Sequence, residues 1–202
     1  MTDCRPSLQL RADTVTAQDD VRLLGVTISS DLSLQCHVSN VSATSFTGCV
    51  SSDVFDDYVT SRVDQCNAVL AGSTKSVTDT LQRVMNAAAR VVSDTRKFDH
   101  GLTQILHDDL HWLDVADRVT YKLCVIMHKC RHGKAPQYLV DCCTPVTDVV
   151  GSLRSATQQL MAVPRHRLTT VGRRAFAVHG PMVWNSLPDN LRAQQDYESE
   201  RV

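Results

Sequence analysis

Apolar and polar residues follow a helical spacing in the middle of the chain. Within 81–92, apolar residues recur every three or four positions and polar residues fall between them, which is typical of an amphipathic helix. Ser76, Thr78 and Asp79 mark its start, because their side chains can accept hydrogen bonds from the first turn, and Ser93-Asp94 marks its end. The expected inner face consists of Leu81, Val84, Met85, Ala88, Val91 and Val92.

The same spacing predicts a second long helix from Asp114, its N-cap, to His132. Gly133 is expected to end it, since glycine readily takes the left-handed conformation found after helix C-termini. Shorter helices are expected at 102–109 and at 135–143, the latter with a proline in its first turn. The inner face of the long helix is expected to hold Val115, Val119, Leu123, Ile126, Met127 and Cys130.

Strand signals lie before these helices. Short strands are expected at 8–10 and 14–16, and the β-branched run 21–28 predicts a longer one. Ser29-Ser30-Asp31 is typical of a turn, and a short helix is expected at 37–44. The C-terminal pattern is weaker, with a strand at 160–163, a helix at 171–179, and an apolar lid anchored by Trp184 and Leu187. The chain is therefore predicted to be mainly α.

Charge is balanced over the whole chain but not along it. The 202 residues carry 21 basic and 22 acidic side chains, a net charge of −1. Residues 1–80 hold ten acids and five bases, whereas residues 149–188 hold five arginines and no acid. A local basic segment can contact phosphates even when the whole molecule is neutral, and a solvated surface loop is the alternative interpretation.

The eight cysteines do not form a disulfide pattern, and two of them, Cys142 and Cys143, are adjacent. The first residues lack a secretory signal, and no apolar run is long enough to span a bilayer. We therefore expect an intracellular, reducing location, nuclear or cytoplasmic, without membrane association. Cys66, Cys124 and Cys130 are expected to be buried free thiols.

Two of these segments also resemble a known family. SRVDQCNAVLAG at 61–72, followed by LQRVMNAAARVV at 81–92, is similar to the SRLDYCN and LQ.VQNAAAR signature found beyond the polymerase palm of LINE-type, non-LTR retrotransposon reverse transcriptases of the jockey-like group. VRLLGVTISSDLSLQCHV at 21–38 resembles the LGV strand-turn-strand that closes the palm and grips the primer. Further blocks follow in the family's order: DLHWL at 109–113, HGKAPQYL at 132–139, VPRHR at 163–167, RAFAVHGP at 174–181 and WNSLP at 184–188.

The resemblance implies a helical, thumb-like bundle at 39–143. A β-hairpin remnant at 1–38, the edge of a missing palm, is expected before it, and a basic, irregular C-terminal region at 144–192 after it. Residues 193–202 are expected to form a disordered tail. The LGV and SRVDQCN blocks are closer together than in the family, and the shortening falls in the poorly periodic stretch 45–55, so we expect that a packing element has been lost.

Polymerase activity is not expected of this chain. The family's reaction uses Mg²⁺ held by palm carboxylates upstream of the LGV strand, and only 23 residues precede Leu24 here. FDDY at 55–58 lies after that strand and lacks the aromatic-x-Asp-Asp order, so we interpret it as a solvated surface pair. No catalytic residue and no cofactor are therefore predicted.

No metal site is predicted either. HDDLH at 107–111 has aspartate where a zinc-protease helix has glutamate, and no third ligand is evident. Cys124, His128 and His132 share one helical stripe, but three ligands from one helix span too far for one zinc ion, and no CxxC pair completes the set. We interpret both groups as ordinary helix packing.

Nucleic-acid contact is the function that the resemblance implies. The family's thumb lies against the RNA/DNA primer-template duplex, where basic side chains bind phosphates. The candidate phosphate contacts are Arg83, Arg90, Arg96, Lys97, Arg165, Arg167, Arg173 and Arg174. We therefore expect a polymerase remnant that binds nucleic acid without activity of its own. The alternatives are a structural or protein-interaction fragment that binds another chain through the exposed palm-facing edge, and an unstable product of a decayed element.

Overall fold

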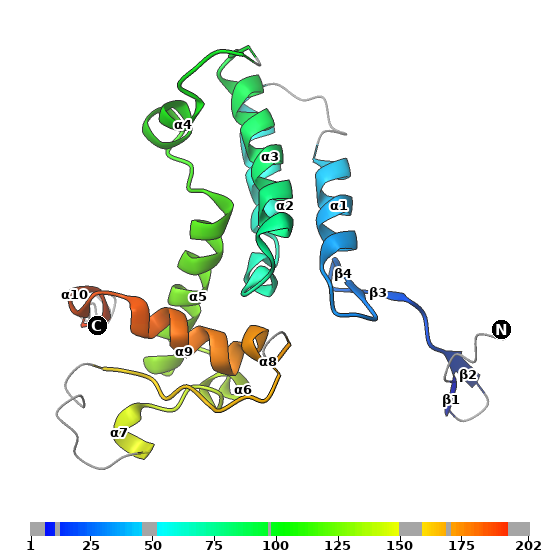
Figure 1. Ribbon diagram of the computed structural model, residues 1–202, viewed down its shortest axis with the longest axis vertical. Helices are drawn as coiled ribbons and strands as arrows, with labels where there is room; N and C mark the ends of the chain where they lie inside the picture. Colours follow the sequence, from blue (N-terminus) through cyan, green and yellow to red (C-terminus); the bar gives the residue numbers. More distant parts are fainter. Residues whose placement is uncertain are drawn as a thin grey trace.

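The computed structural model describes residues 7–10, 13–45, 52–96, 98–149, 159–168 and 171–193. Two β-hairpins come first and helices follow (Figure 1), so the predicted mainly α fold class is confirmed. The strands are β1 Ser7–Leu10, β2 Asp13–Thr16, β3 Asp20–Leu23 and β4 Val26–Ser29. The helices are α1 Gln35–Thr44, α2 Ser52–Asp64, η1 Asn67–Leu70, α3 Lys75–Val92, α4 Leu102–Gln104, η2 Ile105–Asp109, α5 Val115–Arg131, α6 Gln137–Val140, α7 Val146–Val149, α8 Val171–Arg174, α9 Phe176–Ser186 and α10 Asp189–Arg192.

The N-terminal region forms two separate antiparallel hairpins where one was predicted. β1 pairs with β2, and β3 pairs with β4. The single strand predicted across 21–28 is wrong, because the chain reverses at Leu24-Gly25, where φ is 49° and 88°. Positive φ at both central residues matches the twist of a two-residue hairpin. A Cβ on Gly25 would also lie 2.7 Å from Gln65 Nε2, so this turn is packed against the residue that follows α2.

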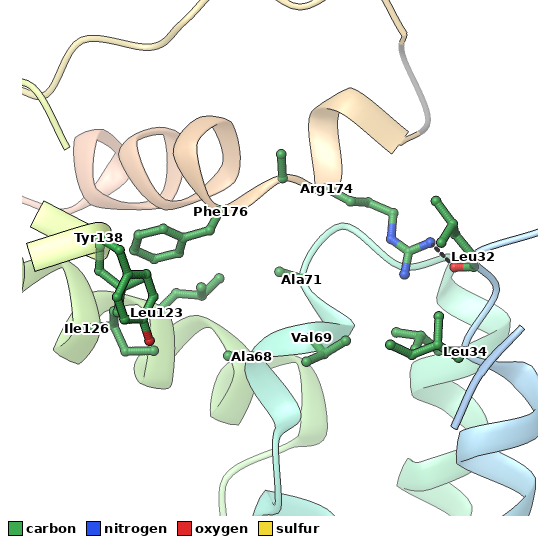
Figure 2. A pocket seen from close by; sticks show the side chains of 13 residues that line it. Leu32, Leu34, Ala68, Val69, Ala71, Leu123, Ile126, Tyr138, Arg174 and Phe176 are labelled. Carbon is green, nitrogen blue, oxygen red and sulfur yellow. Dashed lines mark hydrogen bonds between the residues drawn. The ribbon is translucent and has the colours of Figure 1, made fainter. Parts of the chain in front are cut away.

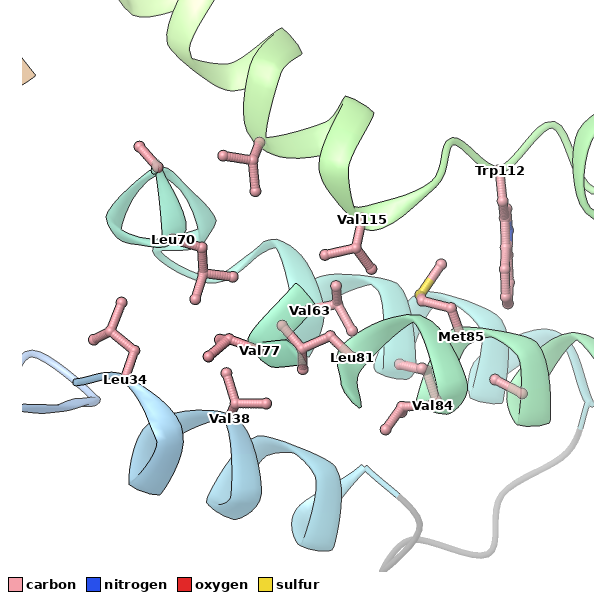
Figure 3. Packing of buried hydrophobic residues seen from close by; sticks show 14 of the residues in the cluster. Leu34, Val38, Val63, Leu70, Val77, Leu81, Val84, Met85, Trp112 and Val115 are labelled. Atoms are coloured by element: carbon pink, nitrogen blue, oxygen red, sulfur yellow. The ribbon is translucent and has the colours of Figure 1, made fainter. Parts of the chain in front are cut away.

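The central helix is α3, which packs against α1, α2 and α5. Figure 3 shows its apolar side chains between these helices. The predicted inner face is confirmed except at Val91, which is 58% exposed, while Ala89 is buried in its place. Val91 lies at the edge of the apolar stripe in the last turn. The predicted start is also shifted, because α3 begins at Lys75 and Thr78 Oγ1 donates to the Lys75 carbonyl instead of capping the helix.

The start of α5 is fixed by a side chain of α3. α5 begins after Asp114, as predicted, but the Asp114 carboxylate does not cap it. Instead, Gln82 Oε1 accepts a hydrogen bond from Val115 N at 2.8 Å, and Gln82 Nε2 donates to Asp114 Oδ1 at 3.0 Å. The predicted end is confirmed at Gly133, with φ 66°. The predicted inner face is also confirmed, since Val115, Val119, Leu123, Met127 and Cys130 are buried and Ile126 is half-buried.

A smaller core forms where α9 packs on α5. The helix predicted at 171–179 is interrupted at Ala175, and α9 then continues to Ser186. Trp184 therefore lies on a helix and not in a lid. Its ring is buried, and Nε1 donates to the Gln159 carbonyl at 2.9 Å. The two helices approach closely at Gly180, where a Cβ would lie 2.7 Å from Met127 Sδ.

The segment around Met161 is bound by the backbone on one side and by a side chain on the other. The strand predicted at 160–163 is reduced to a single bridge between Pro145 and Met161. On its other side the partner is the Asn185 side chain, which accepts from Met161 N at 2.9 Å and donates to Met161 O at 2.8 Å. One amide side chain therefore takes the place of a neighbouring strand. We refer to the Pro145–Met161 bridge and these two bonds as the Asn185 clamp.

Other predicted elements have mixed outcomes. The helices expected at 37–44 and 102–109 are confirmed, the second as α4 followed by the π-turn η2. Most of the stretch 45–55 and residues 194–202 lie outside the described residues. Cys66, expected to be buried, is exposed, because with φ 57° it turns the chain between α2 and η1. In the part of the chain described, no helix is both long and apolar enough to cross a membrane.

Candidate nucleic-acid interface

The predicted cationic residues fall into two groups. One group is on or just after α3 and the other lies between Met161 and the end of α8; Lys97 is outside the described residues. α3 has 18 residues and is therefore about 27 Å long. Arg173 and Arg174 of the second group line a cleft with Thr74 and Val77 at the start of α3, whereas Arg96 lies beyond its end, so the two groups would contact different phosphates. The members are Arg83, Arg90 and Arg96 in the first group, and Arg165, Arg167, Arg173 and Arg174 in the second.

Arg83 and Arg90 lie on the face of α3 opposite its buried stripe. They are two turns apart, about 10 Å along the helix axis. Arg83 is exposed, whereas Arg90 is half-buried and its Nε atom is buried without a hydrogen-bond partner among the described residues. A buried N–H that makes no hydrogen bond is costly, so an anion that reaches Arg90 would remove this penalty.

Arg174 brings together three of the blocks that carry the resemblance. Its Nη1 donates to the Leu32 carbonyl at 2.8 Å across 142 positions of sequence, as Figure 2 shows. Its aliphatic stem packs on Gly72, where a Cβ would lie only 3.1 Å from Arg174 Cγ. Leu32 belongs to the 21–38 block, Gly72 to the 61–72 block and Arg174 to the 174–181 block. The three blocks therefore meet at one arginine side chain.

Two clefts share Arg174 and Leu34 as a common wall. The apolar cleft has a volume of about 660 Å³ and is shown in Figure 2. It is lined by Ile28, Leu32, Leu34, Ala68, Val69, Ala71, Leu123, Ile126, Tyr138, Leu139, Arg174, Ala175 and Phe176. The basic cleft has a volume of about 420 Å³ and is lined by Ser33, Leu34, Gly72, Ser73, Thr74, Val77, Arg173, Arg174 and His179.

Sequence reasoning identified Arg173 and Arg174 but missed the other polar residues of the basic cleft. Ser33, Ser73 and His179 come from three separate segments, and no local spacing connects them. Only the resemblance could have pointed to these residues, because Ser33 and His179 lie inside two of the blocks that carry it and Ser73 directly follows a third.

One buried and one half-buried histidine are expected to make the stability of the chain sensitive to mild acid. Burial lowers the pKa of His37, and the positive charge of Arg22 lowers it further. Burial also lowers the pKa of His179; the Arg173 carbonyl partly opposes this effect, and the Arg173 charge adds to it. Both imidazoles therefore bind a proton less readily in the folded state than in the unfolded chain.

We expect the free energy of unfolding to decrease as the pH falls from about 7.5 through the unfolded histidine pKa of about 6.5. The histidine pKa values are lower in the folded state than in the unfolded chain. Their contribution to stability is therefore complete above about pH 6.5 and is lost as the pH falls toward the folded pKa values. Urea denaturation between pH 7.5 and 5.5 tests this expectation. His37→Leu should make the dependence shallower. A stability that is constant or rises on acidification would contradict it.

The histidine and cysteine sets considered as metal ligands make other contacts. His107 Nδ1 lies 2.9 Å from the Trp112 carbonyl, and His132 Nδ1 lies 2.8 Å from the His128 carbonyl. Burial raises the pKa of the Cys124 thiol, which disfavours the thiolate that a metal requires. Within the described ranges, no three His, Cys, Asp or Glu side chains are grouped so as to hold a metal ion.

Comparison of this chain with protein-family models, with curated proteins and with solved structures finds no match. Any assignment of function therefore depends on the residues and contacts described above.

Proposed function

We propose that this chain is the post-palm part of a LINE-type reverse transcriptase, and that it binds the phosphate backbone of nucleic acid without polymerising it. The main support is the meeting of the 21–38, 61–72 and 174–181 blocks at Arg174. Sequence blocks that resemble one family in order, and that also contact one another in space, behave as parts of one folded unit.

Other contacts between the blocks support the same proposal. Asp64, in the SRVDQCN block, accepts a hydrogen bond from Arg118 Nη1 on α5 at 2.7 Å. Gln82, in the LQRV block, caps α5 directly after the DLHWL block. Asn185, in the WNSLP block, binds Met161. These residues connect parts of the fold to one another. Exposed arginines such as Arg83 are therefore the groups available to bind phosphate.

Binding of the folded chain to a labelled RNA–DNA primer-template across a salt series tests the proposal. We expect log affinity to fall linearly with log salt, with a slope of about 0.9 per neutralised phosphate on a B-DNA-like duplex. The double variant Arg83→Ala/Arg90→Ala should reduce this slope by about two phosphates. Its matched control, Lys122→Ala/Lys129→Ala, removes the same charge from exposed positions of α5 and should change the slope less.

A folded chain that shows no salt-dependent binding would refute the nucleic-acid role. Equal effects of the two double variants would show that net charge, and not the α3 face, determines affinity. Incorporation of nucleotides into the primer by the purified chain would contradict the proposal that it binds nucleic acid without polymerising it.

A second candidate function is protein binding through the palm-facing edge. All four side chains of β3 are exposed. Val21 and Leu23 of this strand, and Leu24 directly after it, are apolar. Exposed Leu32, Val69 and Tyr138 also line the apolar cleft. Apolar surface of this kind favours a protein partner. Light scattering that detects a stable oligomer, together with indifference to nucleic acid, would support this alternative.

A further inference from the structure

The basic cleft at the start of α3 carries an arrangement of groups that points to a specific ligand chemistry. Arg173 and Arg174 reach it from α8, and Ser73 and Thr74 reach it from the segment that leads into α3. Among the described residues that line it, none is acidic. Asp31 does not line the cleft; its Oδ1 accepts a hydrogen bond from Ser33 N–H at 2.8 Å, and the charge of Arg174 contributes to lowering its pKa.

The N-terminus of α3 adds a partial positive charge on one side of this cleft. Thr74 is the N-cap of α3, but its side chain makes no capping bond and instead lies 3.0 Å from Ser76 Oγ. The N–H groups of the first turn therefore have no side-chain acceptor from this residue. The N-terminus of an 18-residue helix carries a partial positive charge that favours an anion.

One polar atom of the cleft lining is buried without a hydrogen-bond partner. Ser73 Oγ makes no hydrogen bond within the described part of the chain, whereas the His179 imidazole interacts with the Arg173 carbonyl, which raises its pKa. Gly72 allows this arrangement, because with φ 64° and no side chain it lets Arg174 and His179 pack against its backbone; a Cβ there would lie 3.1 Å from Arg174 Cγ and 3.5 Å from His179 Cε1. An acceptor oxygen of a bound anion would satisfy Ser73 Oγ.

We infer that the basic cleft is a phosphate-binding site, with Arg173, Arg174 and Ser73 as its ligand-contacting residues and His179 in its wall. This inference rests on the proposed function for the source of the phosphate, which is the nucleic-acid backbone. A free nucleotide presents the same phosphate chemistry and is separated from it by the experiment. The arginines supply charge-assisted hydrogen bonds, and the Ser73 hydroxyl orients the anion.

Titration of inorganic phosphate into the full chain, at constant ionic strength, tests the site directly. The side-chain resonances of His179, assigned with His179→Gln, should shift saturably, and the thermal midpoint should rise. Arg173→Gln should weaken phosphate binding about tenfold, which is the loss expected for one charge-assisted contact. Ser73→Ala should also weaken it. Arg165→Gln removes an exposed arginine that does not line the cleft, and is the matched control.

Unchanged His179 resonances throughout the titration would overturn the inference, as would equal losses in Arg173→Gln and Arg165→Gln. Ser73→Ala keeps the comparison valid if Arg173→Gln fails to fold, because Ser73 Oγ has no partner to lose.

Competition identifies the source of the phosphate. If inorganic phosphate weakens primer-template binding in the wild type but not in Arg173→Gln, the cleft binds the backbone. If a nucleoside monophosphate binds in the cleft and the primer-template is unaffected, the backbone assignment is refuted and the site serves a free nucleotide.

The two proposals can fail separately. Phosphate binding in a chain that ignores the primer-template would refute only the proposed function. Primer-template binding that depends on Arg83 and Arg90, without any phosphate effect on His179, would refute only the cleft.

Discussion

Replacement of Trp184 by alanine is expected to lower the free energy of unfolding by about 3–5 kcal/mol. Trp184 is only 1% exposed and packs in the smaller core together with Met127, Cys130 and Met161. Truncation would leave a cavity there and would also remove the hydrogen bond from Nε1 to the Gln159 carbonyl. Because natural domains have a total stability of about 5–15 kcal/mol, this variant should be close to unfolding. Urea denaturation followed by far-UV circular dichroism measures the change.

Two further variants separate the causes. Trp184→Phe keeps most of the packing and loses the N–H, so it should be less destabilising than alanine by a clear margin. Tyr138→Ala truncates an aromatic residue that is 69% exposed and should change stability little. Equal effects of Trp184→Ala and Tyr138→Ala would show that α9 is not part of the cooperative fold.

Replacement of Met85 by alanine is expected to destabilise the chain by about 2–5 kcal/mol. Met85 is 0% exposed and belongs to the main cluster, where Figure 3 shows it pointing toward Trp112 and Val115. The cavity would therefore open between α3 and the start of α5. Met85→Leu conserves most of the volume and should cost less than about 1.5 kcal/mol.

Val91 provides the control on the same helix. It was expected on the inner face but is exposed, so Val91→Ala should change stability by less than about 0.5 kcal/mol. A large loss in Val91→Ala, or none in Met85→Ala, would mean that α3 is rotated about its axis relative to its neighbours. Chemical denaturation of the three variants under one condition decides between these arrangements.

The long helices could be predicted from the sequence because their signal is local. The inner faces of α3 and α5 follow from a spacing that repeats along each helix, and the left-handed Gly133 ends α5 where the pattern stops. The turn at Leu24-Gly25 could not be predicted in the same way, since β-branched residues lie on both sides of it and suggest one continuous strand.

Long-range contacts explain the other errors. Asp114 was correctly placed at the start of α5, but the group that caps the helix is Gln82, 33 positions before Val115. Likewise, Arg174 was a candidate for its charge, whereas its bond to Leu32 and the cleft around it depend on the packing of α8 against the β4–α1 connection. Spacing along one segment carries no information about such partners.

The Asn185 clamp bears on whether residues can be inserted between Pro145 and Met161. It fixes Met161 beside Pro145 from both sides, and Val146 N and Ala162 N extend the pairing through Leu160 O and Thr144 O. The two paired segments are therefore held together by these bonds as well as by the chain that connects them. Because the entropy cost of closing a loop grows only slowly with its length, extra residues inserted between the paired segments should cost little stability as long as these bonds form.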